Sequence, residues 1–600
     1  MRHNTITAAL CGRKKYYRAA RVIASIIYVV PQKLASPFLH PRFVLVACLL
    51  QSYSSFGNAT LNRTTLSRFV TPEVLFFLLV WTTMLVLFRE RGFFDPGALW
   101  HIKVGELILD HGFMHTDPFT YTFQGEAWIP QQWGAEVLMA LAHKVDKFDT
   151  LLLAFATGIA TLFTMIFARM RRAGMHWILA GVLTGACLFA GSFHYFVRPH
   201  MFTIALLAWT MASLVDFDRG RATLWRLAGL VPLYVLWTNL HGGVLGGNFT
   251  FGLAVAGWGL LFLFKQDSPC KSWRTGWILL GILALCGLTP IVNPFGIEMI
   301  NTWQRIVSSP VLKEHVNEHK PLDLARDADR VIAGFAVLYA AIFLGTLPKR
   351  PRVTWLIPFV WFTLTFQGIR QGPLFVITAA MVIPDLWPET VWCRLLKKYG
   401  DSLVVEPSTE ASTWNFRTWL IPGIAVAIAF LLQSTHTPVP VFGHGWVRLS
   451  DDDGKPLDLT DSLQKYAREK GPNARVFNDA NLGGYMIYFL PEIKIYMDDR
   501  FELYGNDWAK NYVDMMHKYP ERIEAVMTKY ELELAVIPIN KKVKQPMEQY
   551  LEDQSRPWQA LSSVMSGVVY VDAPETISEI PRWKEEVRGQ KGIIYRRLRP

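Results

Sequence analysis

Residues Thr71 to Phe88 read TPEVLFFLLVWTTMLVLF, and Glu73 is the only charged residue among these eighteen. As a helix they would extend for roughly 27 Å, close to the ~30 Å hydrocarbon thickness of a bilayer. Arg89, Glu90 and Arg91 follow at once, as charged residues do where a helix leaves a membrane. This stretch therefore predicts a transmembrane helix.

Similar apolar stretches recur along the chain as far as Ser434, and polar connections separate them. With 51% hydrophobic and 13% aromatic residues, the 600-residue chain is too apolar for a soluble multidomain enzyme. We expect an α-helical polytopic membrane protein with about eleven transmembrane helices. The predicted spans are 71–88, 148–168, 176–195, 200–215, 227–239, 245–264, 276–293, 330–347, 353–369, 373–388 and 418–434.

Basic residues cluster in alternate connections, around Arg172, Arg221, Lys271, Arg350 and Lys397. The net charge of +12 therefore reflects membrane orientation and does not indicate a nucleic-acid surface. The positive-inside rule makes these connections cytoplasmic and predicts a cytoplasmic N-terminus. An odd number of spans then leaves residues 435–600 on the non-cytoplasmic side.

Three regions follow from these patterns. Residues 1–70 are a basic leader, cytoplasmic or interfacial, because their apolar runs are too short to span; an overlong gene start is the alternative. Residues 71–434 form the transmembrane domain. Residues 435–600 form a soluble α/β domain, with helices expected at 459–470, 508–519 and 523–529 and strands at 474–477, 483–489, 494–497 and 534–538.

The first external loop, 89–146, is far longer than a helix connection requires, and loops of this length usually have a function or are disordered. It contains the segment Phe94 to His101, a helix-like run at 102–109, and the segment Thr116 to Thr122. Aromatic side chains with isolated carboxylates suit a membrane-surface pocket for a polar, ring-shaped substrate. An amphipathic interfacial helix anchored by tryptophan explains the same pattern equally well.

Further polar residues lie at the predicted external ends of different spans: Arg198, His241 and Arg370. Asp95 and Asp117 lie on the same side. Because ionisable groups at membrane depth usually face a cavity, one shared external cavity explains all five. Arginine forks suit phosphate oxygens, and a nearby carboxylate can accept a proton from a hydroxyl group.

Each of these residues also has a purely structural explanation. A lone arginine at a helix end commonly reaches for lipid headgroups, His241 can cap a helix beside Gly242-Gly243, and Asp95 before Pro96 can be an N-cap. Asp498-Asp499-Arg500 suits either a ligand contact or a turn with a salt bridge, and the turn is favoured. The six cysteines show neither a disulfide framework nor zinc-ligand spacing.

Several motifs resemble those of bacterial GT-C-type polytopic membrane glycosyltransferases, in an uncharacterised branch distantly similar to protein mannosyltransferases and lipid A aminoarabinose transferases. They extend over residues 71–390, with counterparts in the C-terminal domain. In the order of the chain they are Asp95-Pro96-x-x-x-Trp100-His101, Thr116-Asp117-Pro118-Phe119, Arg198-Pro199, Asn239-Leu240-His241-Gly242-Gly243, Asn293-Pro294-Phe295-Gly296, Arg370-x-x-Pro373, Gly483-Gly484-Tyr485 and Asp498-Asp499-Arg500.

The resemblance implies an inverting transfer of a sugar from a polyprenyl-phosphate donor to an acceptor hydroxyl on the non-cytoplasmic face of the bacterial inner (plasma) membrane. Asp95 would be the catalytic base, with Asp117 the alternative base. From the residue types themselves, Trp100 and His101 of the first loop are expected to contact the sugar, and the donor phosphate to contact Arg198 or Arg370. His241 is a further expected substrate-binding residue. The partners would be this lipid donor, membrane lipid and an envelope acceptor, and not nucleic acid.

Two departures from the family pattern matter. Gly97 stands where related proteins often carry a second acid, and Gln131-Gln132 replace a His-Glu pair. Loss of the paired acid weakens divalent-metal binding, so no metal ligand is assigned and a divalent metal stays only an option. A non-catalytic membrane scaffold and a transporter or flippase of lipid-linked sugar are the rival hypotheses.

Overall fold

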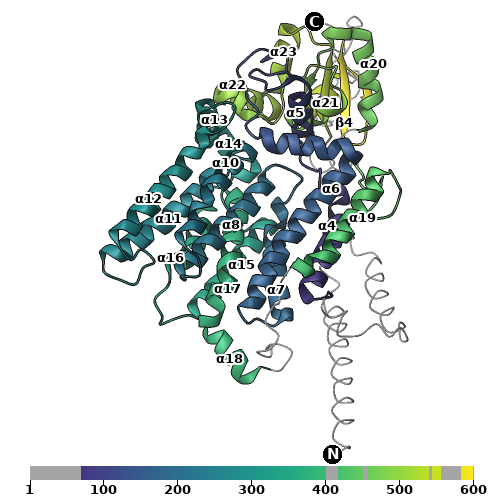
Figure 1. The fold of residues 1–600 in the computed structure, drawn as a ribbon. Coiled ribbons are helices and arrows are strands. Elements are labelled where there is room, and N and C mark those ends of the chain that lie inside the picture. The colour runs from purple at the N-terminus through teal and green to yellow at the C-terminus, as the bar shows by residue number, and fades with distance from the viewer. Residues whose placement is uncertain (1–68, 401–415, 450–456, 540–543, 556–582, 599–600) are drawn as a thin grey trace, which may run out of the picture. The chain divides into compact units, whose positions relative to one another are not determined.

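The computed structural model describes residues 69–400, 416–449, 457–539, 544–555 and 583–598 (Figure 1). The predicted basic leader, 1–70, lies outside the described residues except for its last two. Everything below concerns the described part of the chain.

A helix lies at each of the eleven predicted spans. They are α4 (Pro72–Arg91), α6 (Trp133–Arg172), α7 (Trp177–Gly191), α8 (His200–Asp218), α10 (Leu230–Leu240), α11 (Val244–Leu263), α12 (Trp273–Leu288), α15 (Asp327–Leu344), α16 (Val353–Leu364), α17 (Gly372–Leu386) and α19 (Leu420–Ser434).

Seven of these helical segments, those containing α4, α6, α7, α8, α11, α12 and α17, are long and apolar enough to cross a membrane. The helices α16 and α19 are apolar but shorter. The predicted helical, multi-pass class of fold is confirmed, whereas the number eleven stays a prediction.

Helix α17 lies at the centre of the bundle, where it packs against α6, α7, α8, α15 and α16. Nearly all of its side chains are buried, including the small residues Thr378, Ala379 and Ala380. Small residues let helices approach closely in a membrane. The hydroxyl of Thr378 donates to the carbonyl of Leu374 at 2.8 Å, so this polar group is satisfied inside its own helix.

The connections predicted to be cytoplasmic meet at one end of the bundle. Arg169 Nη2 lies 3.1 Å from Asp216 Oδ1, and Arg219 Nε lies 2.9 Å from Asp385 Oδ2. These pairs join the ends of α6, α8 and α17. Arg198 and Gly372 stand at the opposite ends of α8 and α17, so the predicted external residues share the other side of the bundle.

We expect a reporter active only in the cytoplasm to give signal when fused after Arg172, Lys349 or Lys398, and none when fused after residue 440. The physical reason is the positive charge at the first three sites. A series of fusions in an expressing cell measures this, with a reporter active only outside as its complement. Cytoplasmic signal from the fusion at 440 would show that the predicted orientation is wrong. The side chains predicted to be external would then face the cytoplasm.

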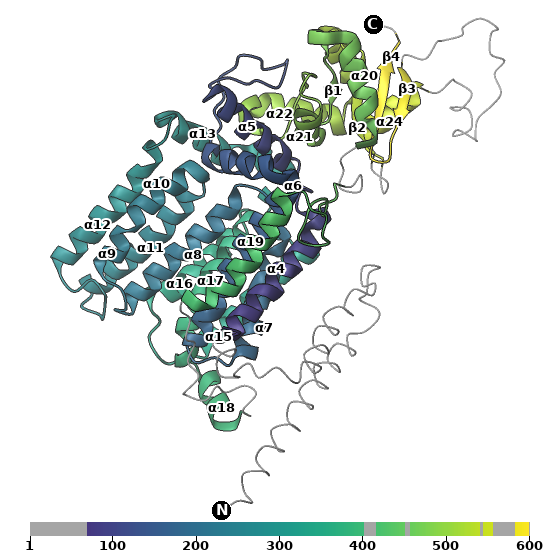
Figure 2. The same cartoon turned by 45° about the vertical axis from the view of Figure 1, so that its right-hand side comes forward.

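The first loop folds as a small layer on the end of the bundle. Helix α5 (Gly97–His111) covers the predicted helical run, and it packs against α6 and against the C-terminal domain (Figure 2). Helix α6 itself is two helices joined at a kink, where Asp146 has φ −151° and Lys147 has φ +51°. Its first part, up to the kink, belongs to the predicted loop.

The C-terminal domain is α/β, as predicted. Its sheet has four strands in the order β1-β2-β4-β3, with β1 (Phe477–Asn478) parallel to β2 (Leu534–Pro538), and with β4 (Gly592–Arg597) antiparallel to β2 and to β3 (Trp583–Arg588). The helices are α20 (Thr460–Lys470), α21 (Ala480–Phe489), α22 (Phe501–His517), α23 (Ile523–Lys529) and α24 (Pro546–Ser555).

The predicted strand at 483–489 is wrong, because these residues belong to α21. Asp479 caps this helix by accepting the N–H of Asn481 at 2.9 Å. Its glycines serve close packing, since a Cβ on Gly484 would lie 2.1 Å from the Pro96 carbonyl oxygen. The predicted strand at 474–477 moves to Phe477–Asn478, and 494–497 makes only isolated bridges, to Arg475 and Thr120.

Candidate functional site

Asp95 precedes helix α5, and both of its carboxylate oxygens are engaged. Oδ1 accepts the N–H of Gly97 at 2.8 Å, which is the local turn contact that the sequence Asp-Pro-Gly allows. Oδ2 accepts Nη1 of Arg198 at 2.8 Å. The side chains of Asp95 and Arg198 keep 19% and 24% of their exposure, so ligands can still reach this pair.

Arg198 lies in the short segment between α7 and α8, on the predicted external side. Burial alone would lower the pKa of its guanidinium. The nearby carboxylates of Asp95, Glu318 and Asp499 raise this pKa by more than burial lowers it, so the net shift is upward. The guanidinium therefore stays charged at any physiological pH. It is a permanent cation beside a carboxylate.

Asp499 joins this pair from the C-terminal domain. Its Oδ1 accepts the indole N–H of Trp100 at 2.8 Å. Burial, together with the neighbouring carboxylates of Asp95 and Asp498, raises the pKa of Asp499 to about 7. Asp499 is thus an acid that changes protonation near neutral pH, in contact with the first loop.

The three side chains converge on Gly97. A Cβ built on Gly97 would lie 2.9 Å from Asp95 Oδ1, 3.2 Å from Asp499 Oδ2 and 3.3 Å from Arg198 Nη2. We call Asp95, Gly97, Trp100, Arg198 and Asp499 the Asp95 cluster. The absence of a side chain at Gly97 leaves room for the carboxylate of Asp499, so the second acid of the cluster comes from a distant part of the chain.

Asp117, the other predicted base, is buried in an ion-pair network. Its Oδ1 accepts Nη2 of Arg500 at 2.7 Å, and both side chains are 0% exposed. Its Oδ2 accepts the backbone N–H of Thr120 at 2.9 Å and the hydroxyl of Thr120 at 2.5 Å. Arg500 also pairs with Asp498 at 2.6 Å. The favoured interpretation of a salt bridge thus describes Asp498 and Arg500, while Asp499 between them belongs to the Asp95 cluster.

His101 is fully buried beside Trp100. Its Nδ1 lies 2.8 Å from Oε1 of Glu136, which is also buried. Burial, with a smaller effect of Arg198, lowers the pKa of His101 well below its usual range, so the ring is neutral at pH 7. Its Nε2 has no hydrogen-bond partner among the described residues.

Arg370 lies in the short 3-10 turn Ile369–Gln371, just before α17, and its Nη1 is 2.8 Å from His319 Nε2. Glu318 precedes that histidine. Although burial opposes ionisation, the guanidinium groups of Arg198 and Arg370 lower the pKa of Glu318 to about 2. Burial and the charge of Arg370 lower the pKa of His319 to about 4. Glu318 therefore couples the two predicted donor-binding arginines electrostatically.

His241 ends α10, and its contacts are local. Its Nδ1 lies 2.8 Å from the hydroxyl of Thr203 and accepts the N–H of Gly243 at 2.9 Å. Burial, followed by the charges of His200 and Arg370, lowers the pKa of His241 well below its usual range. These contacts match the capping interpretation, with a neutral ring.

The structure brings Asp95, Trp100 and Arg198 into one cluster. His101 follows Trp100 in α5, and Asp117 is paired with Arg500 outside the cluster. His241 and Arg370 interact with the cluster only electrostatically: the charge of Arg198 acts on His241, and both arginines act on Glu318. The sequence prediction gave Glu318 no role, and for Asp498-Asp499-Arg500 it favoured a salt-bridged turn over a ligand contact. The two adjacent acids before Arg500 marked a polar turn, but they did not indicate that Asp499 would meet Gly97. Nothing in the local sequence of Glu318 distinguished it.

Asp95 and Asp499 are the carboxylates of the cluster that a divalent metal would use. Asp95 already bonds Arg198, and Asp499 already accepts from Trp100. A metal ion would have to compete with a guanidinium for Asp95. The cluster therefore suits an anionic ligand and a proton acceptor better than a divalent cation.

No family model matches the chain, and no curated protein is significantly similar to it in sequence. Among solved structures it is similar to the Archaeoglobus fulgidus oligosaccharyltransferase in its apo form, with 13% identity and a TM-score of 0.43, over 77% of this chain and 69% of that one. It is also similar to ArnT from Cupriavidus metallidurans bound to undecaprenyl phosphate, with 13% identity and a TM-score of 0.43, over 87% of this chain and 97% of that one.

Proposed function

We propose that the chain is a membrane glycosyltransferase that moves a sugar from a polyprenyl-phosphate donor to an acceptor hydroxyl on the non-cytoplasmic face. The observation that carries the proposal is the convergence of Asp95, Arg198 and Asp499 on Gly97. A fixed guanidinium beside two carboxylates offers a phosphate-binding group next to proton acceptors. The motif order resembling GT-C-type enzymes supports the same chemistry.

In the proposed reaction, the acceptor oxygen attacks the anomeric carbon while the bond from that carbon to the donor phosphate oxygen breaks. Asp95 removes the acceptor proton, and Arg198 stabilises the charge that grows on the departing phosphate. Arg370 contacts the same phosphate. Attack opposite the leaving group inverts the anomeric configuration. Trp100, beside His101, offers an aromatic face to the sugar ring.

Asp499 adds a second function to the cluster. With a pKa of about 7, its ionised form can take up the proton that Asp95 has removed, returning Asp95 to its charged form. Asp117 would then hold Arg500, and through it the loop that carries Asp498 and Asp499, without touching substrate. The two acids predicted as alternative bases thus receive different roles.

A transfer assay on the purified chain tests the proposal. The assay would supply polyprenyl-phosphate sugars and a panel of acceptors, and would measure the glycosylated product by mass spectrometry. Product formation supports the transferase. Exchange of lipid-linked sugar between vesicle leaflets without product would support a transporter or flippase, and neither activity would support a scaffold. Sugar lipid that co-purifies with the chain would identify the donor to use.

Asp499→Asn should remove an ionisation near pH 7 from the pH profile. In the wild type, transfer should rise with pH through about 7 as Asp499 becomes charged, and this limb should vanish in the variant. Stability should move the other way: between about pH 4 and 7 the folded chain binds more protons at Asp499 than the unfolded chain, so stability falls as pH rises. Transfer rates and unfolding temperatures across pH 4 to 9 measure both effects. Profiles of the same shape in both proteins would exclude a proton-transfer role for Asp499.

A further inference from the structure

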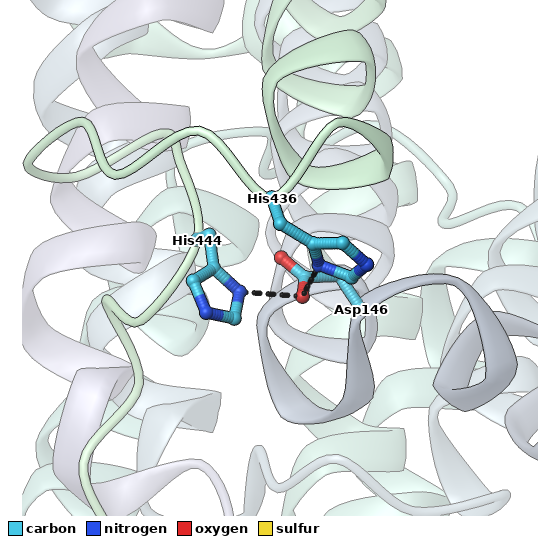
Figure 3. Close-up of side chains that lie close together, drawn as sticks. All are labelled: Asp146, His436 and His444. Carbon is cyan, nitrogen blue, oxygen red and sulfur yellow. Dashed lines mark hydrogen bonds and ion pairs between the residues drawn. The ribbon is translucent and has the colours of Figure 1, made fainter.

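We propose that Asp146, His436 and His444 form a binding site for a zinc ion on the segment that leads from the last membrane helix to the C-terminal domain. These residues come from two distant parts of the chain, the kink of α6 and the segment after α19 (Figure 3). One oxygen of Asp146 faces both imidazole rings. The proposal is independent of the Asp95 cluster.

The distances between the three side chains suit a shared ligand. Asp146 Oδ1 lies 3.0 Å from His436 Nδ1 and 2.7 Å from His444 Nδ1 (Figure 3). The three donor atoms all lie within 4.8 Å of one another. Ligands of tetrahedral zinc are separated by about 3.4 Å, given metal–ligand bonds of about 2.1 Å. Small rotations of the two rings would therefore admit the ion.

The carboxylate of Asp146 has unused binding capacity. Its side chain is only 2% exposed, and its Oδ2 has no hydrogen-bond partner among the described residues. A buried carboxylate oxygen without a partner is costly, and a cation held by both oxygens of Asp146 would remove that cost. The lack of a partner for Oδ2 is what distinguishes a metal site here from a pair of ordinary hydrogen bonds.

The segment is already held in a shape that presents the histidines. Asp149 accepts the N–H of Gly445 at 2.8 Å through Oδ2 and the N–H of Val447 at 2.7 Å through Oδ1. The N–H of His444 donates to the carbonyl of Thr437 at 3.0 Å, which closes the segment on itself. Because the backbone of this segment is already fixed, ion binding loses less conformational entropy than it would with a flexible segment.

The donor set indicates which metal to expect. Two imidazoles and one carboxylate suit Zn²⁺, whereas Mg²⁺ and Ca²⁺ prefer oxygen ligands alone. The side chains of His436 and His444 are 63% and 46% exposed, so water can reach a fourth position. Bound zinc would connect the segment 435–449 to the kink of α6. It would thereby hold in place the segment that leads into the C-terminal domain.

Metal analysis of the full chain, purified in detergent through a tag that contains no histidine, tests the site. We expect about one zinc per wild-type chain by mass spectrometry of the digested protein. Added Zn²⁺ should raise the unfolding temperature of the metal-stripped chain, while Mg²⁺ should not. Asp146→Asn should bind zinc at least about 100-fold more weakly, since loss of an outer-shell partner alone costs about 10- to 100-fold.

Asp146→Asn is the informative variant because an amide oxygen can still accept from both rings, so the fold should persist. His444→Ala should lose zinc as well, whereas His517→Ala, which removes an exposed histidine of α22, should keep it. Equal zinc content and equal Zn²⁺ stabilisation in wild type and Asp146→Asn would overturn the site. A wild-type chain that neither holds nor responds to zinc would also overturn it. Stoichiometric iron or copper in place of zinc would overturn the choice of metal.

Discussion

Asp95→Asn is expected to lower the rate of sugar transfer by about 10²- to 10⁴-fold while membrane insertion and folding persist. Asparagine has nearly the volume of aspartate, and its amide oxygen can still accept the N–H of Gly97, as Asp95 Oδ1 does. What disappears is the negative charge and the proton acceptor facing Arg198. The change therefore isolates the proposed chemistry from the local turn.

The loss of the ion pair itself should have a small effect on stability. Asp95 and Arg198 remain partly exposed, and pairs of this kind contribute about 0–1 kcal/mol. Single-turnover transfer rates and unfolding temperatures, measured on the same preparations, separate the two effects. Asp110→Asn is the matched control, because Asp110 is an exposed acid of the neighbouring helix α5.

Three results would change the assignment. Wild-type transfer by Asp95→Asn together with inactive Asp499→Asn would make Asp499 the base. Wild-type transfer by Asp95→Asn together with inactive but folded Asp117→Asn would make Asp117 the base. A wild-type chain that transfers none of the sugars offered would favour the scaffold.

Arg500→Met is expected to destabilise the folded chain by about 3–5 kcal/mol. Arg500 is fully buried between the carboxylates of Asp117 and Asp498, which are also buried. Methionine keeps most of the side-chain volume but leaves two buried negative charges facing each other without a cation. Both then become costly, because the protein interior cannot solvate them. An unfolding temperature lower by roughly 2–4 °C is the expected measurement, because a chain of 600 residues has a large entropy of unfolding.

The matched control for this variant removes all three charges at once. A triple variant, Asp117→Asn, Asp498→Asn and Arg500→Met, should recover much of the lost stability, since burying uncharged groups is far less costly than burying unpaired charges. A triple variant no more stable than Arg500→Met would show that the unpaired carboxylates do not account for the lost stability. Its contacts with Phe119 and Trp128, at 5.0 and 4.5 Å, would then explain the loss.

The membrane helices could be predicted because length and hydrophobicity decide them almost alone. Thr71 to Phe88 has no alternative to a helix once it enters lipid, where every backbone polar group needs a partner within the segment. Soluble elements depend more on tertiary contacts. The helix at 523–529 and the strand at 534–538 were predicted with their observed bounds, whereas α21 was taken for a strand. A short apolar run buried on every side has no periodicity that separates the two.

Only the part of the candidate site that comes from the first loop and the helix bundle could be predicted from the sequence. Asp95, Trp100 and Arg198 stand in recognisable motifs at the ends of predicted elements, so a shared external position followed from topology. Asp499 could not be added, because its meeting with Gly97 depends on how the C-terminal domain packs against α5. The same limit applies to Asp146, His436 and His444, which are separated in sequence by a whole bundle of helices.

The origin of the second carboxylate has a consequence for biosynthesis. Trp100 and Asp499 are bonded to each other although 399 positions separate them along the chain. A ribosome must complete most of the protein before these two groups can meet. In the predicted topology, the final segment must also cross the membrane and fold on the non-cytoplasmic side. A nascent chain with most of its helices already inserted still has only one acid beside Gly97. The proposed transfer activity would therefore arise late in synthesis, as a property of the finished molecule.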